Sequence, residues 1–252
     1  MKHRENREPR ERLSGDPIGG LVVYEDRDIL VVNKPTGMIT SSGPRDRRPT
    51  LWGTVQKRAI AQRHRFPMGL IHRLDRDASG LLVFSKHDEA YQALKKQFFR
   101  HTVERVYLAV VHGVMNQGKG QVSSRLVERA DGSVHSTNRP GVGELAISHF
   151  EVCETANGYS LVRVTLETGR KHQIRVHLSE MGFPVVGDEV YKPKQGPTRK
   201  QKAAQAKLEM PANPQLMLTA VRLCLDHPMT EKRMEFEIDL PPHMREFMRA
   251  LK

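Results

Sequence analysis

Cysteine is almost absent from this chain of 252 residues, which contains Cys153 and Cys224 and no other. The two thiols do not form a CxxC pair and have no spacing suited to zinc. We therefore expect neither a disulfide framework nor a structural metal site. A protein with so few thiols fits a reducing compartment such as the cytoplasm.

Long apolar runs are also missing. No segment approaches the ~20 consecutive apolar residues of a membrane span, and the N-terminal MKHRENREPRERLSGDP offers no apolar stretch for a signal peptide. A glycine-rich phosphate loop is lacking as well. We therefore expect a soluble cytoplasmic monomer with no membrane partner, no cofactor and no metal.

Positive charge, in contrast, is abundant and unevenly distributed. The formal net charge is +12 and the sequence pI is about 9.9. Residues 45–76 hold nine Lys or Arg against two Asp, and residues 192–207 hold six Lys or Arg and no acid. A local positive field of this kind is what a surface that follows a phosphate backbone requires, so RNA is the expected partner. Two solvated loops would give the same pattern.

The chain divides by composition into a tail and one domain. Residues 1–20 mix Arg with Glu and lack apolar periodicity, which predicts a flexible charged tail. Residues 21–252 are expected to form a single catalytic domain. Within it, residues 192–214 are rich in Lys, Gln, Pro and Ala, which indicates a basic surface insertion or mobile loop.

Hydrophobic periodicity predicts many strands and a few helices. Thr50 and Asp88 are the expected N-caps of two helices, a third helix is expected over residues 172–182, and a short one closes the chain. Ser79 and Gly80 are read as a turn. These elements predict an α+β fold with a large mixed, mostly antiparallel sheet, flanking helices and a basic RNA-binding cleft. The expected strands cover residues 21–25, 29–34, 80–86, 105–113, 144–154, 159–168, 216–225 and 233–238.

The densest cluster of reactive groups lies in GLIHRLDRDASGLLVFSK, residues 69–86. It places His72, Arg73, Asp75 and Arg76 between apolar segments. A carboxylate held beside arginines stays ionised, because the positive charge favours the charged form, and it can then act as a nucleophile. The alternative is a structural Asp–Arg pair that ties a loop to the core.

A second cluster lies in ETGRKHQIRVHLSEMGFPVVGDEVY, residues 167–191. Arg170, His172 and Arg175 surround the start of the expected helix, whose free N–H groups favour a phosphate or a carboxylate. His172 and His177 lack the intervening Glu of a zinc-protease helix, so they do not indicate a metal pair.

Together these segments resemble the RluA-type pseudouridine synthase family from Val22 to about Tyr191. The family's Lys-Pro-x-Gly turn appears at residues 34–37, and its His-Arg-Leu-Asp signature with a Ser-Gly pair at residues 72–75 and 79–80. Its active-site tyrosine strand and its last motif appear at residues 104–113, 168–177 and 187–188. Ala78 and Lys171 depart from the family, which usually has Thr at both positions.

The resemblance implies an RNA pseudouridine synthase, which isomerises a uridine within RNA without a cofactor. Asp75 would start glycosidic cleavage by attacking either the ribose or the uracil, Tyr107 would stack on the uracil, and Arg175 would pair with Asp75. Arg73 would fill the space left by the flipped base. RNA contacts are further expected from His72, Arg76, Arg170, Lys171 and His172. Some members add an N-terminal RNA-binding domain of the S4 type, which is not expected here.

Two other functions stay open from the sequence. The first is a catalytically silent RNA-binding or ribosome-assembly factor that uses the same basic surface. The second is a metal-dependent RNA hydrolase built on Asp75, Asp77 and His72. For a synthase, ribosomal and transfer RNA are both possible substrates.

Overall fold

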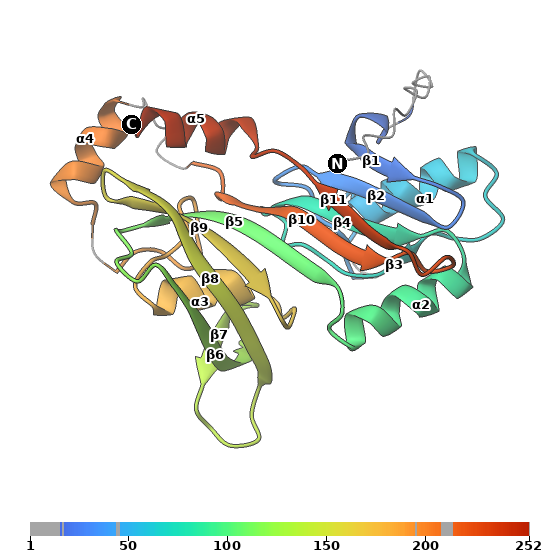
Figure 1. Cartoon of the computed structure of the whole chain (residues 1–252), viewed down its shortest axis with the longest axis horizontal. Coiled ribbons are helices and arrows are strands. Elements are labelled where there is room, and N and C mark those ends of the chain that lie inside the picture. Colours follow the sequence, from blue (N-terminus) through green and yellow to red (C-terminus); the bar gives the residue numbers. More distant parts are fainter. Residues whose placement is uncertain (1–15, 17, 44–45, 195, 208–213, 252) are drawn as a thin grey trace.

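A single twisted sheet organises the computed structural model, which describes residues 16, 18–43, 46–194, 196–207 and 214–251 (Figure 1). The strand order is β1-β2-β4-β10-β5-β9-β8-β6-β7, with β11 added to β10 and β3 to β4. Every pairing between described strands is antiparallel except that of β4 with β10. The predicted α+β class with a mostly antiparallel sheet is confirmed.

The N-terminal half of the sheet carries two helices. Its strands are β1 (Val22–Glu25), β2 (Ile29–Lys34), β3 (Gly69–Leu70) and β4 (Ser79–Ser85). Helix α1 (Leu51–Ala61) begins at Thr50, whose side chain accepts the Gly53 N–H as predicted. Helix α2 (Asp88–Phe99) is capped by His87 through the Ala90 N–H, so the predicted Asp88 cap is wrong. Asp88 instead lies in the first turn, where its charge suits the helix dipole.

The other half of the sheet carries helix α3 (Gln173–Glu180) beside a long hairpin. Two strands of this half of the sheet, β6 and β7, were not expected from the sequence. Alternate β6 residues are exposed, and apolar side chains are too few to give a clear strand signal. The strands of this half are β5 (Glu104–His112), β6 (Lys119–Glu128), β7 (Val134–Thr137), β8 (Glu144–Ala156) and β9 (Tyr159–Leu166).

The two halves meet where β4 pairs with β10 (Leu218–Asp226), which in turn pairs with β11 (Arg233–Glu237). The contact is brief, with Thr219 opposite Ser79 and Ala220 opposite Gly80. Gly80 has φ +113°, and a Cβ there would lie 2.3 Å from the Ala220 carbonyl oxygen. Only glycine allows the two backbones to approach this closely. Ser79 and Gly80 therefore begin strand β4 and do not form the predicted turn.

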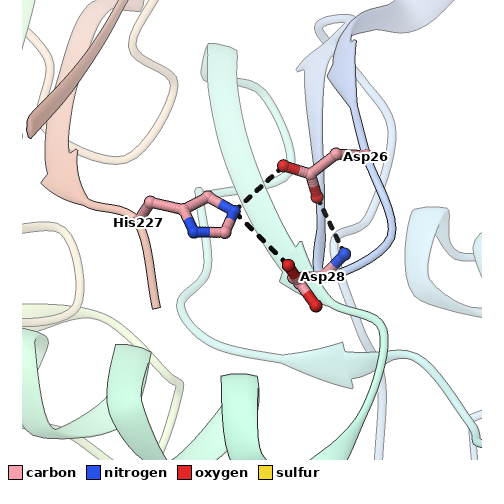
Figure 2. A group of neighbouring side chains, drawn as sticks. All are labelled: Asp26, Asp28 and His227. Atoms are coloured by element: carbon pink, nitrogen blue, oxygen red, sulfur yellow. Dashed lines mark hydrogen bonds and ion pairs between the residues drawn. The ribbon is translucent and has the colours of Figure 1, made fainter. Parts of the chain in front are cut away.

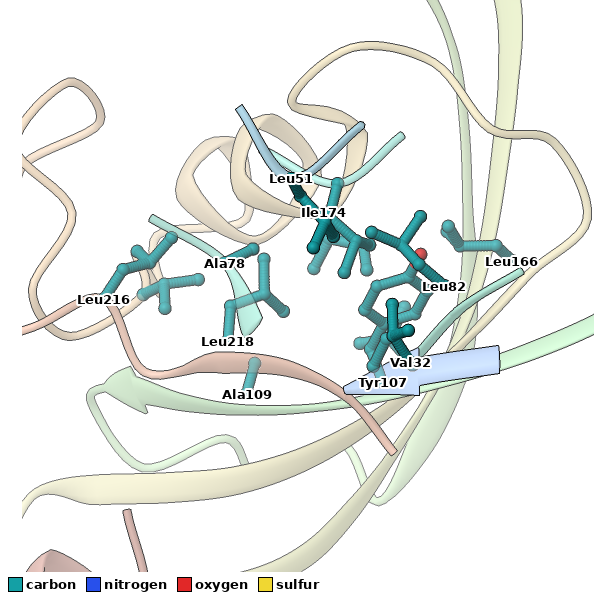
Figure 3. Close-up of a cluster of buried hydrophobic side chains, with 14 of the residues drawn as sticks. Val32, Leu51, Ala78, Leu82, Tyr107, Ala109, Leu166, Ile174, Leu216 and Leu218 are labelled. Carbon is teal, nitrogen blue, oxygen red and sulfur yellow. The ribbon is translucent and has the colours of Figure 1, made fainter. Parts of the chain in front are cut away.

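One hydrophobic core crosses this boundary (Figure 3). Val32 and Leu82 come from the first half, and Tyr107, Leu166 and Ile174 come from the second. Burying each large aliphatic side chain contributes about 1.5–3 kcal/mol, so this core fixes the two halves relative to each other. Further cores lie under α2 and under α5 (Pro242–Ala250).

The tail and the insertion are more ordered than the sequence suggests where the structure describes them. Ile18 is 1% exposed and belongs to the main core, so packed structure begins before Leu21. In the insertion, Arg199–Lys207 form helix α4, and Gln201 is buried against the Gly158 carbonyl. Residues 1–15, 17, 44–45, 195, 208–213 and 252 lie outside the described part, so the start of the basic stretch 45–76 is not described. No described helix is both long and apolar enough to cross a membrane.

Candidate active site

Asp75 lies on the segment between β3 and β4, which is fastened on both sides of the carboxylate. The Thr40 hydroxyl donates to the Leu74 carbonyl oxygen at 2.7 Å, and the Thr36 hydroxyl donates to the Asp77 carbonyl oxygen. These bonds tie the loop to the turn that follows β2. The backbone next to Asp75 is therefore fixed by residues more than thirty positions away.

Lys34 reinforces this attachment from inside the protein. It is 0% exposed, and its ammonium donates to three carbonyl oxygens at 2.8–3.0 Å, those of Pro35, Met38 and Arg76. Burial lowers the pKa of Lys34 to about 8, although the nearby carboxylates of Asp77 and Asp75 oppose the shift. Lys34 thus uses all three of its donors to join the Lys-Pro-x-Gly turn to the Asp75 loop.

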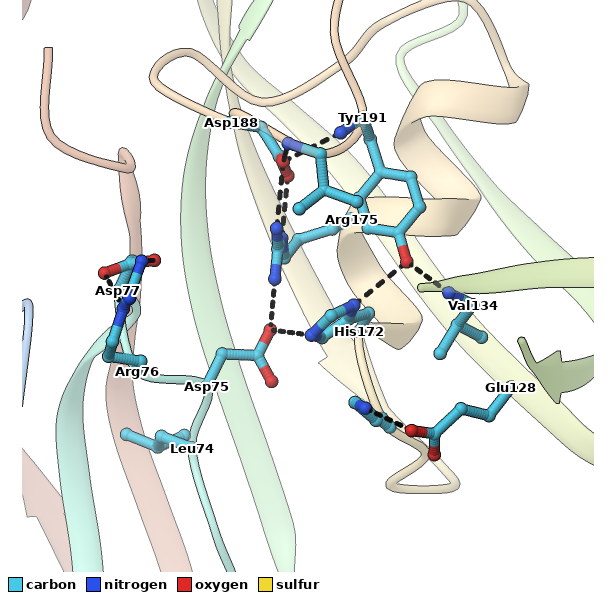
Figure 4. A network of polar contacts seen from close by, with 12 residues as sticks. Leu74, Asp75, Arg76, Asp77, Glu128, Val134, His172, Arg175, Asp188 and Tyr191 are labelled. Atoms are coloured by element: carbon cyan, nitrogen blue, oxygen red, sulfur yellow. Dashed lines mark hydrogen bonds and ion pairs between the residues drawn. The ribbon is translucent and has the colours of Figure 1, made fainter. Parts of the chain in front are cut away.

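Arg175, on α3, binds two carboxylates at once (Figure 4). It donates from Nη1 to Asp75 Oδ2 at 3.0 Å, and from Nε and Nη2 to both oxygens of Asp188 at 2.7 and 2.9 Å. Burial favours the neutral form of Asp188, but its hydrogen bonds with Arg175 outweigh this effect and its pKa is lowered. Arg175 is therefore a fixed cation that holds Asp75 from one side.

Tyr191 and His172 continue this network back toward Asp75. The Tyr191 hydroxyl accepts the Val134 N–H at 2.8 Å and lies 2.9 Å from His172 Nδ1. His172 Nε2 lies 4.0 Å from Asp75 Oδ2. We call the five residues Asp75, Arg175, Asp188, Tyr191 and His172 the carboxylate ring (Figure 4).

Tyr107 approaches the same carboxylate from the core. Its ring is 7% exposed and packs with Val32, Leu82 and Leu166 (Figure 3). Burial raises the pKa of Tyr107, and the negative charge of Asp75 adds to the rise while Arg105 opposes it. Asp75 and Arg175 are thus in direct contact, and Tyr107 lies within electrostatic range of Asp75.

The predicted RNA-binding cations are mostly exposed and lie around this site. Arg73 is exposed near Glu128, and Lys171 pairs with the same Glu128 at 2.5 Å. Arg76 pairs with its neighbour Asp77 at 2.9 Å, and Arg170 pairs with Glu144 at 2.8 Å. Exposed pairs like these are weak, so the cations can exchange their partners for phosphates.

His72 is the exception among the predicted contacts. Its Nε2 accepts the Val83 N–H at 3.3 Å, and its ring stacks on Phe98 at 4.7 Å between centroids. Burial lowers the pKa of His72 to about 3. His72 is therefore a neutral structural acceptor, and the structure does not bring it together with Asp75 and Asp77 as the hydrolase hypothesis requires.

Three residues of the site were not identified as functional from the sequence, namely Lys34, Asp188 and Tyr191. In the sequence, Lys34 belongs to the Lys-Pro-x-Gly turn and Asp188 to the last motif, whereas Tyr191 only ends the segment 167–191. A buried arginine needs a carboxylate partner, and Asp188 could have been found by that requirement. Tyr191 gave no comparable signal.

A second cluster of histidine and aspartate lies at the β1–β2 turn (Figure 2). His227 Nε2 lies 3.0 Å from Asp26 Oδ2, and His87 Nε2 lies 2.9 Å from Asp28 Oδ1. We call these four residues the junction cluster. The Nδ1 atoms accept the backbone N–H groups of Thr230 and Ala90, so each Nε2 carries the proton that it donates to a carboxylate. A metal ion at Nε2 would have to displace that proton. The junction cluster therefore serves to connect these segments of the chain by hydrogen bonds.

Comparison with known proteins gives a consistent result. A family model described as RNA pseudouridylate synthase matches residues 28–180. The Bacillus subtilis protein named "Uncharacterized RNA pseudouridine synthase YlyB" is 36% identical over 94% of this chain and 74% of its own length. The "Ribosomal large subunit pseudouridine synthase D" of Pseudomonas aeruginosa is 37% identical over 87% of this chain and 68% of its own.

Solved structures agree on the fold. The structure titled "Human RNA Pseudouridylate Synthase Domain Containing 4" superposes with a TM-score of 0.78 at 23% identity, covering 93% of this chain and 94% of that one. At this identity the likeness shows the arrangement of the sheet and helices, and the chemistry depends on the residues of the site.

Proposed function

The chain belongs to the RNA pseudouridylate synthase family, and on this basis we propose that Asp75 is the catalytic carboxylate of the reaction. As a member it is an isomerase that converts uridine in RNA to pseudouridine. The observation that carries the proposal is the contact between Asp75 and Arg175, two residues that lie 100 positions apart in the sequence.

The geometry of Asp75 suits attack by one oxygen. Oδ2 is held by Arg175, whereas Oδ1 accepts no hydrogen bond from the part of the chain that the structure describes. The Asp75 side chain is 23% exposed, so a nucleotide can reach it. The reaction breaks the bond between ribose C1′ and uracil N1 and forms one between C1′ and C5. The C5 proton is lost and N1 gains one, so no oxidant or reductant is needed.

The surrounding cations support binding of a flipped nucleotide. Extruding a base from the RNA costs a few kcal/mol. We propose that Arg73, which is exposed and two residues from Asp75, occupies the space that the flipped base leaves between its neighbours. We propose that Arg76, Arg170 and Lys171 contact phosphates. Tyr107, which lies within electrostatic range of the Asp75 carboxylate, would stack on the uracil. His72, which binds a backbone N–H, is left out of this set.

Large-subunit ribosomal RNA is the substrate we propose, because several of the similar proteins are named for that activity. Transfer RNA is the second candidate. The enzyme would act in the cytoplasm, where its RNA is. One catalytic domain in one chain would suffice, since all five residues of the carboxylate ring come from this chain.

The test is release of tritium from RNA labelled at C5 of uridine. We expect the purified protein to release it in a chelator, and Asp75→Asn to reduce the rate by about 1,000-fold or more while still binding RNA. Undiminished release by Asp75→Asn would refute the assignment. A protein that binds RNA but never yields pseudouridine would indicate the silent RNA-binding factor, and parallel reactions with ribosomal and transfer RNA would identify the substrate.

A further inference from the structure

The carboxylate ring is closed at every link but one. Arg175 bonds to Asp75 and Asp188, Asp188 accepts the Tyr191 N–H at 2.9 Å, and the Tyr191 hydroxyl meets His172. Between His172 Nε2 and Asp75 Oδ2 the distance is 4.0 Å, which is too long for a hydrogen bond. The open link therefore lies at the catalytic carboxylate itself.

The protonation of His172 follows from its neighbours. The Tyr191 hydroxyl oxygen accepts the Val134 N–H, and the hydroxyl can therefore donate its own hydrogen bond to His172 Nδ1. A neutral ring whose Nδ1 accepts this hydrogen bond carries its single N–H proton on Nε2, the nitrogen that faces Asp75. Burial lowers the pKa of His172, with the charge of Asp75 opposing the shift, so the neutral form is favoured.

His172 is also held in place more firmly than a surface residue would need. It is the N-cap of α3 with φ 54°, a left-handed conformation that histidine adopts more often than most residues but that still costs energy. Its partner Tyr191 is fixed by the Asp188 carboxylate and by the Arg175 guanidinium, which lies 5.1 Å from the ring centroid. The His172 side chain is only 16% exposed, which disfavours a role as a phosphate contact.

We propose that His172 is a positioning residue for the reaction, in which the Tyr191 hydroxyl sets its tautomer and the Nε2 proton keeps Asp75 Oδ2 turned toward α3. This inference rests on the proposed catalytic role of Asp75. With Oδ2 held by Arg175 on one side and drawn to His172 on the other, Oδ1 stays directed toward the nucleotide. The neutral ring can do this without adding another positive charge to the carboxylate.

Two substitutions of His172 separate this role from a purely structural one. Glutamine places an amide N–H near the position of Nε2, whereas asparagine is too short but tolerates the left-handed backbone better. We expect His172→Gln to keep most of the single-turnover rate of pseudouridine formation and His172→Asn to lose about tenfold more, with KM for the RNA unchanged. The melting temperatures should rank in the opposite order. Equal rates, a faster asparagine variant or a loss that appears in KM would overturn the proposal.

Tyr191→Phe tests the same idea without altering His172. It removes the hydroxyl but keeps the ring beside Arg175. We expect the single-turnover rate to fall about tenfold in the wild-type background and to change little in the His172→Asn background, because the hydroxyl acts through the imidazole. Independent, multiplying losses in the double variant would contradict the proposal.

The wild type and Asp75→Asn are run alongside these variants. If the wild type makes no pseudouridine in any RNA, the proposed function itself fails. If the wild type is active, Asp75→Asn is not, and His172→Asn reacts at the full rate, only the role of His172 fails.

Discussion

The carboxylate ring and the junction cluster use the same residue types and differ in how completely they are bonded. In the junction cluster, both imidazoles accept backbone N–H groups at Nδ1 and reach a carboxylate within 3.0 Å at Nε2. In the carboxylate ring, His172 stops 4.0 Å short of Asp75, and Asp75 Oδ1 is left unbonded by the described residues. A saturated cluster can only stabilise the fold, whereas an incomplete one has capacity left for a substrate.

The comparison also separates the two kinds of evidence that a variant can give. Breaking the junction cluster should show in stability and leave the rate per folded molecule unchanged. Breaking the carboxylate ring should show in the rate, and in stability only where the lost group is buried.

Arg175→Met should give the largest combined effect. It leaves the buried Asp188 carboxylate without its cation, which costs about 3–5 kcal/mol in unfolding free energy. It also releases Asp75, so the rate should fall by about 100-fold or more. Denaturant titration and single-turnover assays measure the two effects. Arg163→Met, which breaks an exposed pair with Glu151, is the matched control and should change neither appreciably.

Asp28→Asn tests the junction cluster. Asp28 accepts the His87 Nε2 proton at 2.9 Å and lies 3.7 Å from His227 Nε2, so an amide would turn its own N–H group toward one of these N–H donors, at a cost of about 2 kcal/mol in unfolding free energy. Because Asp28 lies in the saturated cluster, kcat/KM per folded molecule should equal that of the wild type. A loss of rate without a loss of stability would contradict the distinction between the two clusters.

His72 extends the comparison to pH. Its pKa is about 3 in the folded protein against 6.5 for a free histidine, so between these values the unfolded chain binds a proton that the folded chain does not. Holding His72 neutral therefore costs no stability above pH 6.5. Below that pH the free energy of unfolding falls by about 1.4 kcal/mol per pH unit. His72→Gln should remove this part of the slope between about pH 6 and about pH 5. Parallel pH curves for both proteins would show that His72 is not held neutral.

Glu128→Gln should give the smallest effect. Glu128 is exposed and pairs with Lys171 close to Arg73, so removing its charge frees positive charge for phosphates. We expect kcat/KM to rise about twofold at low salt and the gain to disappear at high salt, because exposed charges are screened. Folding stability should not change measurably. A fall in kcat/KM would mean that Glu128 serves the reaction.

Local patterns in the sequence sufficed for much of the fold. Thr50 marked the start of α1, and alternating or continuous apolar residues located most strands. The pattern failed where partners from distant parts of the chain decide the outcome. Ser79 and Gly80 become strand because Thr219 and Ala220 lie beside them, and β6 is held by β8 despite its polar surface.

The site was predicted in part for a related reason. Asp75, Tyr107 and Arg175 were selected by resemblance to a family, and the structure places Arg175 against Asp75. His72 has the residue type of a functional group, but Phe98 and the Val83 N–H give it a structural role that only packing reveals. Lys34 acts by donating to backbone carbonyl oxygens, and Tyr191 acts by setting the tautomer of His172. Both roles depend on contacts in the folded chain that the residue type alone does not reveal.

The most direct test of the account is the turnover per folded molecule of Asp75→Asn, measured beside Asp28→Asn on the same RNA below both melting temperatures. We expect no pseudouridine above background from Asp75→Asn and wild-type turnover from Asp28→Asn. Turnover by Asp75→Asn that approached the wild-type value would contradict it.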